Sequence, residues 1–474
     1  MSLPTLSPIK HTWIQSFSQD KDQIKALLTQ YNSPINVHNM VPFEENFREF
    51  TAVFEHYDLG HKIFFARKAN KSIAFVKQAK ALGFGVDTAS YKELLECISV
   101  GVLPEDITLT AAVKEDKLVR LAVENDVPIV IDNLDECDQV QRIAEEMQKT
   151  VTVGIRIGGF LYNGEHLYSR FGFSPNVVVG LISDSLGEGN KYSRLKFAGF
   201  HFHLNGYSTV QRAEALLQTI KCVDRLKERF ISTLFIDFGG GFLINYLENK
   251  SEWEHFHYEL KKALMGEREP ITFRNDSLGM HLIDGQLHGE PKVYPYYNDI
   301  PRAKFLEEIL TYQDPLGIPI HSLLKDRNIE VRIEPGRSLL DQTGITIARV
   351  AFRKRDIEET LLIGLEMNRT QLFSSSMDFL LDPIIIHQNI DHDAEPVTGY
   401  LVGAYCLEQE LILKRKITFK QMPEIGDMIC FVNTAGYMMH FYESEAHLFE
   451  LARNLVAVEN NDAFKVVPDG EFDL

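Results

Sequence analysis

The chain has 474 residues, an ordinary apolar share and a formal net charge of −18, and its length fits one large domain and a smaller one. The acidic charge argues against nucleic acid as a partner, because such a chain does not attract phosphate backbones. No run approaches the roughly 20 apolar residues that span a bilayer, and the start of the chain lacks a signal-peptide pattern, so we expect a cytoplasmic protein with no membrane partner.

Residues 1–44 are polar and show little periodicity, and a regular alternation begins after them. Short runs rich in β-branched and aromatic residues alternate with helical patterns, which is typical of βαβ units and a parallel sheet. The candidate strands are Lys62–Ala69, Gly83–Ala89, Asp106–Ala112, Pro128–Asn133, Thr152–Gly159, Phe197–Leu204, Thr233–Gly240 and Glu330–Arg337. Between the sixth and seventh of them, apolar residues from Val210 to Leu226 recur at helical spacing. The pattern predicts a (β/α)8 barrel over residues 45–345, although an open sheet would explain it too.

The alternation is interrupted before the last of these strands by far more residues than one crossover helix needs. The excess, at about residues 245–300, is rich in Gly, Pro, Asp, His and Tyr, and it is either an active-site cover or a surface elaboration. After about Ile345 short strands and turns predict a second, mostly antiparallel β domain over residues 346–474, which residues 1–44 are expected to join. The strands predicted there include Thr360–Leu365, Ile384–Gln388, Glu410–Thr418 and Met428–Asn433.

Polar residues collect at the C-terminal ends of the predicted barrel strands. They are Lys68, Asp87, Arg156, His203, the triplet Gly239–Gly240–Gly241, and Glu334 with Arg337. In a closed barrel these ends meet on one face, where barrel active sites lie. A single polar strand end would be weak evidence, but the repetition of this feature around the barrel predicts an active site.

Each of these residues has a functional and a structural interpretation. Lys68 would point into the barrel mouth, where partial desolvation lowers its pKa and makes its amine a nucleophile, or it is a solvated lysine. The glycine triplet cradles a phosphate with its N–H groups or forms a tight turn, and its spacing is not that of a Walker loop or a dinucleotide fingerprint. Arg337 could bind a phosphate and Glu334 could stabilise a protonated ring nitrogen, or the two form a surface pair.

The segment HFHLNGYS follows the sixth strand. His203 could stack on a flat ring and Ser208 could donate to a phosphate, although a lone histidine here is more often structural. Two histidines two residues apart also suggest a metal pair, but no carboxylate partner is evident in the sequence. The five cysteines form no CxxC pair and no zinc spacing, which suits a reducing compartment. No metal is expected.

The motifs FFARKAN, GFGVDTAS, HFHLNGYS, FIDFGGGF, EPGRSLLDQTG, GAYC and TAGYM together resemble those of the fold type III pyridoxal-phosphate (PLP) decarboxylases. This group contains the diaminopimelate, ornithine and arginine decarboxylases and is related to alanine racemase. The resemblance runs from about Ile35 to Tyr442 and is closest to the diaminopimelate branch. It implies PLP as the cofactor and a head-to-tail homodimer with shared active sites.

The resemblance also implies roles for individual residues. Lys68 matches the lysine that forms the internal aldimine, and His203 matches the histidine stacked on the pyridine ring. Glu334 matches the acid that faces the pyridine nitrogen, and Cys406 matches the cysteine that the partner subunit supplies. The other residues expected at the cofactor are Asp87, Arg156, Ser208, Gly239, Gly240, Gly241, Arg337 and Tyr437.

The implied reaction is decarboxylation of an α-amino acid, through an aldimine on Lys68 and a quinonoid intermediate. Racemases of this fold place an arginine at the ring nitrogen, so Glu334 favours decarboxylation, with Cys406 as the candidate acid that reprotonates Cα. The alternatives are a PLP-dependent racemase or epimerase, and a PLP-binding regulatory homologue that has lost turnover.

Several departures from the family pattern indicate a divergent subfamily. The acid that usually follows the cysteine and holds the substrate's distal amine is replaced by Leu407, so either Glu408 or Glu410 takes over or the substrate lacks that amine. The family's HxGS is lengthened to HLNGYS, TAGYM reverses the usual Gly-Ala order, and EMNRTQLFSSS replaces the usual asparagine-aspartate segment. The identity of the substrate therefore stays open.

Overall fold

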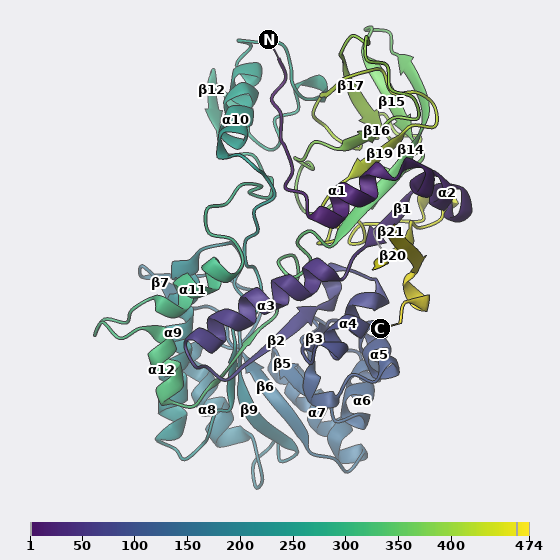
Figure 1. The fold of residues 1–474 in the computed structure, drawn as a ribbon. Helices are drawn as coiled ribbons and strands as arrows, with labels where there is room; N and C mark the ends of the chain where they lie inside the picture. The colour runs from purple at the N-terminus through teal and green to yellow at the C-terminus, as the bar shows by residue number, and fades with distance from the viewer. Residues whose placement is uncertain (1, 461–462, 474) are drawn as a thin grey trace. The chain divides into compact units, whose positions relative to one another are not determined.

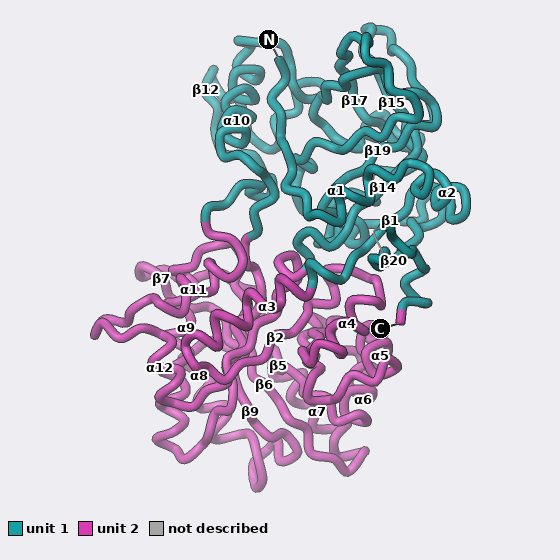
Figure 2. The backbone as a smooth tube through the Cα atoms, viewed as in Figure 1, with its two compact units in different colours: residues 1–43, 244–299, 340–472 teal, residues 44–243, 300–339, 473–474 magenta. Residues whose placement is uncertain are grey.

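The computed structural model describes residues 2–460 and 463–473 (Figure 1). The chain divides into two compact units, which Figure 2 shows in different colours. Unit 1 comprises residues 1–43, 244–299 and 340–472, and unit 2 comprises residues 44–243, 300–339 and 473–474. The segment 244–299, which corresponds to the insertion predicted in the barrel at about residues 245–300, groups with unit 1.

Unit 2 is built on a closed barrel of parallel strands in the order β10-β13-β2-β3-β4-β5-β6-β9. The strands are β2 (His61–Ala66), β3 (Gly85–Thr88), β4 (Ile107–Leu109), β5 (Ile129–Ile131), β6 (Val151–Arg156), β9 (Leu195–His201), β10 (Phe235–Asp237) and β13 (Glu330–Ile333). Every one of them overlaps a predicted strand. The prediction of a closed barrel is therefore confirmed, and the open sheet is excluded.

Helices surround the barrel (Figure 1). They are α3 (Val41–His56), α4 (Ile73–Ala81), α5 (Tyr91–Val100), α6 (Asp116–Glu124), α7 (Leu134–Glu146), α8 (Pro175–Ser185), α9 (Thr209–Lys227), α11 (Ala303–Thr311) and α12 (Ile320–Asp326). The face of α9 from Ala213 to Leu226 is buried as its spacing predicts, while Val210 at its start is exposed. The strands are buried because helices cover the outside of the barrel and side chains fill its interior.

Several predicted strands extend beyond the C-terminal ends of the observed strands, because the chain leaves the sheet where the polar residues begin. After β2, for example, Arg67–Ala69 form the 3-10 turn η1. A short hairpin of β7 (Leu161–Tyr162) and β8 (Glu165–His166) follows β6. The other 3-10 turns of the chain are η2 (Pro104–Asp106), η3 (Phe273–Asn275), η4 (Arg369–Gln371), η5 (Ala446–Leu448) and η6 (Asp469–Glu471).

Unit 1 contains a nine-stranded sheet that is mostly antiparallel, as predicted. Its strands are β1 (Ile35–His38), β14 (Gly344–Arg355), β15 (Leu361–Leu365), β16 (Ile384–Ile386), β17 (Val397–Val402), β18 (Ile417–Phe419), β19 (Met428–Phe431), β20 (Arg453–Asn460) and β21 (Ala463–Pro468). The N-terminal strand β1 lies between β14, to which it is antiparallel, and β20, to which it is parallel. Residues 35–38 of the N-terminal segment are thus part of this sheet.

The rest of unit 1 consists of α1 (Thr12–Gln19), α2 (Lys21–Tyr31), α10 (Lys250–Leu264) and a hairpin of β11 (His281–Ile283) and β12 (Gln286–His288). The predicted strand 410–418 is wrong for most of its length, because β18 begins only at Ile417. Just before it, the backbone N–H groups of Lys414 and Arg415 donate to the carboxylate of the buried Asp378, at 3.0 and 3.3 Å, instead of to a strand. None of the helices in the described ranges combines the length and the hydropathy that a membrane span requires.

Candidate active site

The polar strand ends of the barrel border a cavity of about 470 Å³ in unit 2. Of the residues predicted from the sequence, Lys68, Arg156, His203 and Glu334 line this cavity. They come from four different strand ends that the closed barrel brings together, as expected for an active site at its C-terminal face.

Lys68 lies in η1 and forms an ion pair with Asp87 on β3. Its Nζ donates to Asp87 Oδ2 over 2.6 Å, and Thr110 donates to the other carboxylate oxygen. Asp87 is fully buried. Burial and the nearby charge of Glu334 raise the pKa of Asp87, while Lys68 opposes the shift. A carboxylate with a raised pKa beside an ammonium group is suited to accept the proton that the amine must lose before it attacks a carbonyl.

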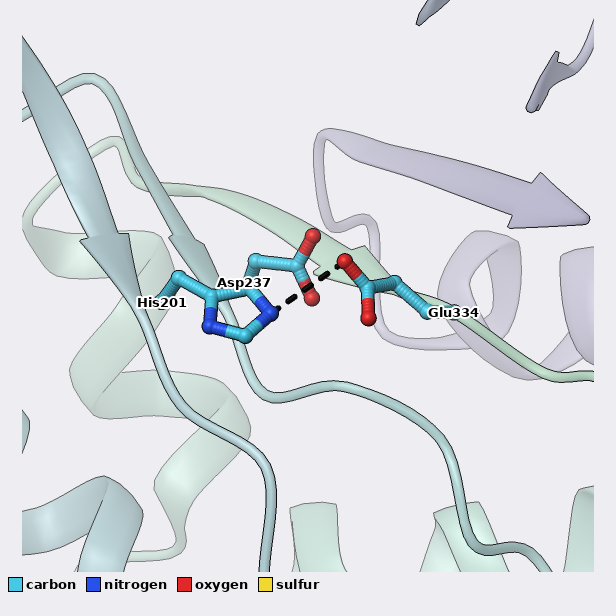
Figure 3. Close-up of side chains that lie close together, drawn as sticks. All are labelled: His201, Asp237 and Glu334. Atoms are coloured by element: carbon cyan, nitrogen blue, oxygen red, sulfur yellow. Dashed lines mark ion pairs between the residues drawn. The ribbon is translucent and has the colours of Figure 1, made fainter. Parts of the chain in front are cut away.

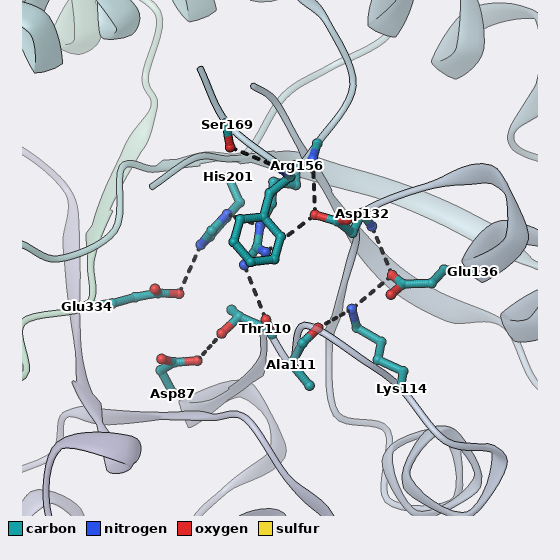
Figure 4. A network of polar contacts seen from close by, with 12 residues as sticks. Asp87, Thr110, Ala111, Lys114, Asp132, Glu136, Arg156, Ser169, His201 and Glu334 are labelled. Carbon is teal, nitrogen blue, oxygen red and sulfur yellow. Dashed lines mark hydrogen bonds and ion pairs between the residues drawn. The ribbon is translucent and has the colours of Figure 1, made fainter. Parts of the chain in front are cut away.

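Arg156 at the end of β6 belongs to a buried polar network (Figure 4). Its Nε donates to His201 Nδ1 over 3.1 Å, and its Nη2 donates to the Thr110 carbonyl over 3.2 Å. Its Nη1 lies 3.4 Å from Asp132 Oδ1. Since arginine can only donate, Nδ1 of a neutral His201 accepts, and the ring proton is on Nε2.

A second branch of the network supports Asp132. The buried Lys114 lies 2.8 Å from Glu136 Oε2, and the same oxygen accepts from the backbone N–H of Asp132 over 2.9 Å. Asp132 Oδ1 also accepts from the backbone N–H of Gly172 over 3.1 Å. The branch therefore fixes the carboxylate that holds one end of the Arg156 guanidinium.

His201, Asp237 and Glu334 form a buried cluster in which one ligand atom from each residue lies within 4.8 Å of the others (Figure 3). His201 Nε2 lies 3.2 Å from Glu334 Oε1. Burial and the charge of Arg156 lower the pKa of His201 well below its usual value, so the ring is neutral. Burial and the charge of Glu334 raise the pKa of Asp237 well above its usual value.

The sequence pattern does not indicate His201 and Asp237 as site residues, and no carboxylate beside the histidines is evident in it. The register explains both, because β9 and β10 place His201 directly opposite Asp237. One signal was available, since residues two apart on a strand face the same way, and His203 follows His201 at that spacing. The ligand atoms of the cluster are close enough together to hold a metal ion, and Asp237 is the member whose pKa burial raises.

The glycine triplet after β10 lies against the end of β13. Gly239 and Gly241 have φ of +73° and +84°, in the left-handed region that favours glycine. A Cβ at Gly240 would lie 2.4 Å from the carbonyl oxygen of Glu334. The backbone N–H groups of such a turn form a concave site for an anion. The half-buried Arg337 follows Glu334 in the adjoining loop.

His203 and Ser208 lie in the loop between β9 and α9. The His203 ring borders the cavity, and its Nδ1 lies 3.0 Å from the Leu204 carbonyl. Loss of surrounding water and the charge of Lys68 lower the pKa of His203 to about 4. Ser208 is the N-cap of α9, where its hydroxyl oxygen accepts from the backbone N–H of Gln211 over 3.2 Å.

Comparisons with known proteins agree with this geometry. Residues 42–271 match the family model described as pyridoxal-dependent decarboxylase, pyridoxal binding domain. The chain is similar to the fold type III PLP decarboxylases over this region, which covers somewhat less than half of its 474 residues. Across 447 residues it is 26% identical to a Sinorhizobium fredii protein called uncharacterized protein y4yA, covering 93% of this chain and 91% of that one.

Two further relatives are diaminopimelate decarboxylases. The enzyme of Staphylococcus aureus is 24% identical over 437 residues, which cover 90% of each chain. The crystal structure of the enzyme from M. jannaschii superposes with a TM-score of 0.69 at 16% identity, covering 94% of this chain and 91% of that one. The similarity to the M. jannaschii structure shows a shared fold alone.

The family cofactor is PLP, and the residues of the barrel mouth fit it. Glu334 lines the cavity, yet its buried Oε1 has no hydrogen-bond partner among the described residues, because the contact with His201 is not aligned as a hydrogen bond. An acceptor of this kind suits the protonated nitrogen of a pyridine ring. The nest of glycine N–H groups suits the phosphate, and Lys68 supplies an amine for the aldehyde.

We expect Gly240→Ala to disrupt the cofactor site. The new Cβ would meet the Glu334 carbonyl at 2.4 Å, so the triplet and the end of β13 must separate. Overpacking of this kind costs about 1–3 kcal/mol, and PLP retention should fall together with the midpoint of urea unfolding. Gly60→Ala is the matched control, because a Cβ there comes no nearer than 4.0 Å to other atoms. Equal PLP retention and equal unfolding midpoints in the two variants would contradict the close packing of the triplet.

The remaining predicted residues lie in unit 1. Cys406 and Glu408 are exposed, and Tyr437 is half-buried with a φ of +71°. Glu410 is 4% exposed, and its carboxylate accepts from the backbone N–H of Arg369 over 2.7 Å. Burial raises the pKa of Glu410. Glu410 is therefore engaged within its own unit, and Glu408 is the more accessible of the two acids.

Proposed function

We propose that this protein decarboxylates an α-amino acid with PLP as its cofactor and Lys68 as the lysine that binds the cofactor aldehyde. The observation that carries the proposal is the buried carboxylate of Glu334, whose Oε1 lacks a hydrogen-bond partner among the described residues. PLP supplies an electron sink for the electron pair that remains when carbon dioxide departs. A carboxylate at the ring nitrogen strengthens this sink, whereas an arginine would weaken it, so decarboxylation is favoured over racemisation.

The neighbours of Lys68 and Glu334 support these roles. Asp87 holds the amine of Lys68 over 2.6 Å and has a raised pKa, so it can take up the proton of the ammonium group. His201 is neutral, and its Nε2 lies 3.2 Å from Glu334 Oε1 without an aligned hydrogen bond, so the ring brings no positive charge that would compete for the carboxylate. Arg156, Thr110 and their network orient the wall of the cavity.

Cys406 is the proposed acid that returns a proton to Cα. By the family pattern it comes from the partner subunit of a head-to-tail homodimer, and an exposed thiol in unit 1 is compatible with that position. Glu408 is the proposed contact for a distal group of the substrate, with Glu410 as the less accessible alternative. Tyr437 and Arg337 are proposed to complete the phosphate site.

We expect Cys406→Ala to retain PLP but to form product at least about a hundredfold more slowly, the lower end of what one positioned acid contributes. If the sites are shared, mixed dimers of Cys406→Ala and Lys68→Ala protomers should regain part of the activity, because one of the two sites would be complete. The measurement is the rate of amine formation by tagged, purified mixed dimers. Absence of rescue in verified mixed dimers would count against sharing. Cys137→Ala, at a buried thiol on α7, is the control for loss of a cysteine.

The decisive experiment measures carbon dioxide release from PLP-loaded protein over a panel of amino acids. The panel includes diaminopimelate, lysine, ornithine, arginine and carboxylated or conjugated diamino acids. Release from one compound would support the proposal and identify the preferred side chain. Exchange of the Cα proton with solvent, without release of carbon dioxide, would instead support a racemase or epimerase. A normal PLP spectrum without either reaction would favour a regulatory homologue.

A further inference from the structure

Arg212 on α9 is a buried cation beside the glycine triplet. Only 1% of the residue is exposed, and burial lowers the pKa of its guanidinium to about 10. Over residues 2–460 and 463–473, no carboxylate forms an ion pair with it. A buried charge without a counter-ion is costly. The buried guanidinium of Arg212 therefore requires a partner of opposite charge or strong hydrogen bonds.

The guanidinium donates to backbone carbonyls of two loops. Its Nη2 lies 2.8 Å from the Gly206 oxygen, 3.3 Å from the Leu204 oxygen and 3.4 Å from the Gly240 oxygen. Its Nη1 lies 3.4 Å from the Ser208 oxygen. Three of these carbonyls belong to the loop after β9 and one to the glycine triplet after β10. A single side chain therefore fastens both loops.

The contacts also orient the N–H groups of these loops. In a trans peptide the carbonyl and the following N–H point in opposite directions. Because the carbonyls of Gly206 and Gly240 face Arg212, the N–H groups of Tyr207 and Gly241 point away from it. A Cβ at Gly241 would lie only 2.3 Å from Arg212 Nη2, so the backbone is in direct contact with the guanidinium. Donors turned outward with a cation behind them attract an anion.

We propose that Arg212 is a positioning residue for the phosphate group of PLP, which orients the phosphate-binding backbone and adds positive charge from behind it. This inference rests on PLP as the cofactor and not on decarboxylation. It explains how the lengthened loop HLNGYS is held, since its hydroxyl residue Ser208 is the N-cap of α9 while Arg212 binds the loop carbonyls.

The test compares the affinities of the apoprotein for PLP and for pyridoxal, which lacks the phosphate. Arg212→Met should weaken PLP binding by at least about tenfold, a loss expected for charge-assisted contacts, and leave pyridoxal binding nearly unchanged. Arg212→Lys should recover part of the loss, because it keeps the charge but not the planar fork. The ³¹P chemical shift of bound PLP should move in both variants.

Gln218→Met is the matched control, because Gln218 lies on the same helix and donates to the Leu161 carbonyl over 2.8 Å. It should leave the ratio of the two affinities at the wild-type value. Equal weakening of PLP and pyridoxal by Arg212→Met would overturn the proposal, and so would a wild-type ratio in Arg212→Lys if the methionine variant does not fold. Wild-type protein that binds PLP but releases no carbon dioxide would contradict the proposed function and leave this test intact.

Discussion

Lys68→Ala is expected to abolish turnover and the covalent retention of PLP. The amine of Lys68 is the proposed nucleophile for the cofactor aldehyde, and it donates to Asp87 over 2.6 Å. Losing an activated nucleophile removes a complete step of the mechanism, so the rate should fall about a thousandfold or more. The measurement is turnover with added PLP, together with the visible absorption of the protein and the PLP that stays attached after borohydride reduction.

Lys62→Ala is the control for this experiment. Lys62 lies near the opposite end of the same strand β2, where it pairs with Asp106 over 2.5 Å. Its loss should cost about 1 kcal/mol of stability or less and leave the absorption band in place. An unchanged band in Lys68→Ala would refute the assignment of the lysine, whereas loss of the band in both variants would point to general damage of the barrel.

The barrel could be predicted because its information is local. Each strand is a short apolar run followed by a polar strand end, and the closed topology then brings Lys68, Arg156, His203 and Glu334 to one cavity. The cluster of His201, Asp237 and Glu334 could not be predicted in the same way, because it depends on which strands are neighbours. In the barrel β10 lies between β9 and β13, and the register of these strands places three residues that are far apart in sequence within one cluster.

Arg212 illustrates the same limit on a helix. Its position on α9 fits an ordinary polar site in an amphipathic pattern. Only the folded loops show that its guanidinium donates to the carbonyls of Gly206 and Gly240. The fold of unit 1 is even harder to predict from the sequence. Its sheet depends on the pairing of β1 with β14 and β20, and the carboxylate of Asp378 binds backbone N–H groups that the local pattern assigns to a strand.

Glu334→Gln is expected to reduce turnover by about a hundredfold to a thousandfold, which is the loss found when one preorganised electrostatic contact to developing charge is removed. The amide keeps the size of the side chain but not its charge, so PLP content should change little. The measurements are the rate of carbon dioxide release and the PLP content of the purified variant. Glu330→Gln, at the other end of β13, is the control, because Glu330 pairs with Arg332 over 2.5 Å outside the cavity.

Asp237 offers an explanation if Glu334→Gln loses less turnover than expected. Burial and, after it, the charge of Glu334 raise the pKa of Asp237, so removing that charge lowers this pKa in part and shifts the carboxyl group of Asp237 towards its charged form. The double variant Glu334→Gln/Asp237→Asn prevents this, while the asparagine oxygen can still accept from the backbone N–H of Gly239. We expect the double variant to lose more activity than Glu334→Gln, although Asp237→Asn alone changes little. Wild-type turnover in the double variant would rule out a role for negative charge at the ring nitrogen, and with it the argument that favours decarboxylation.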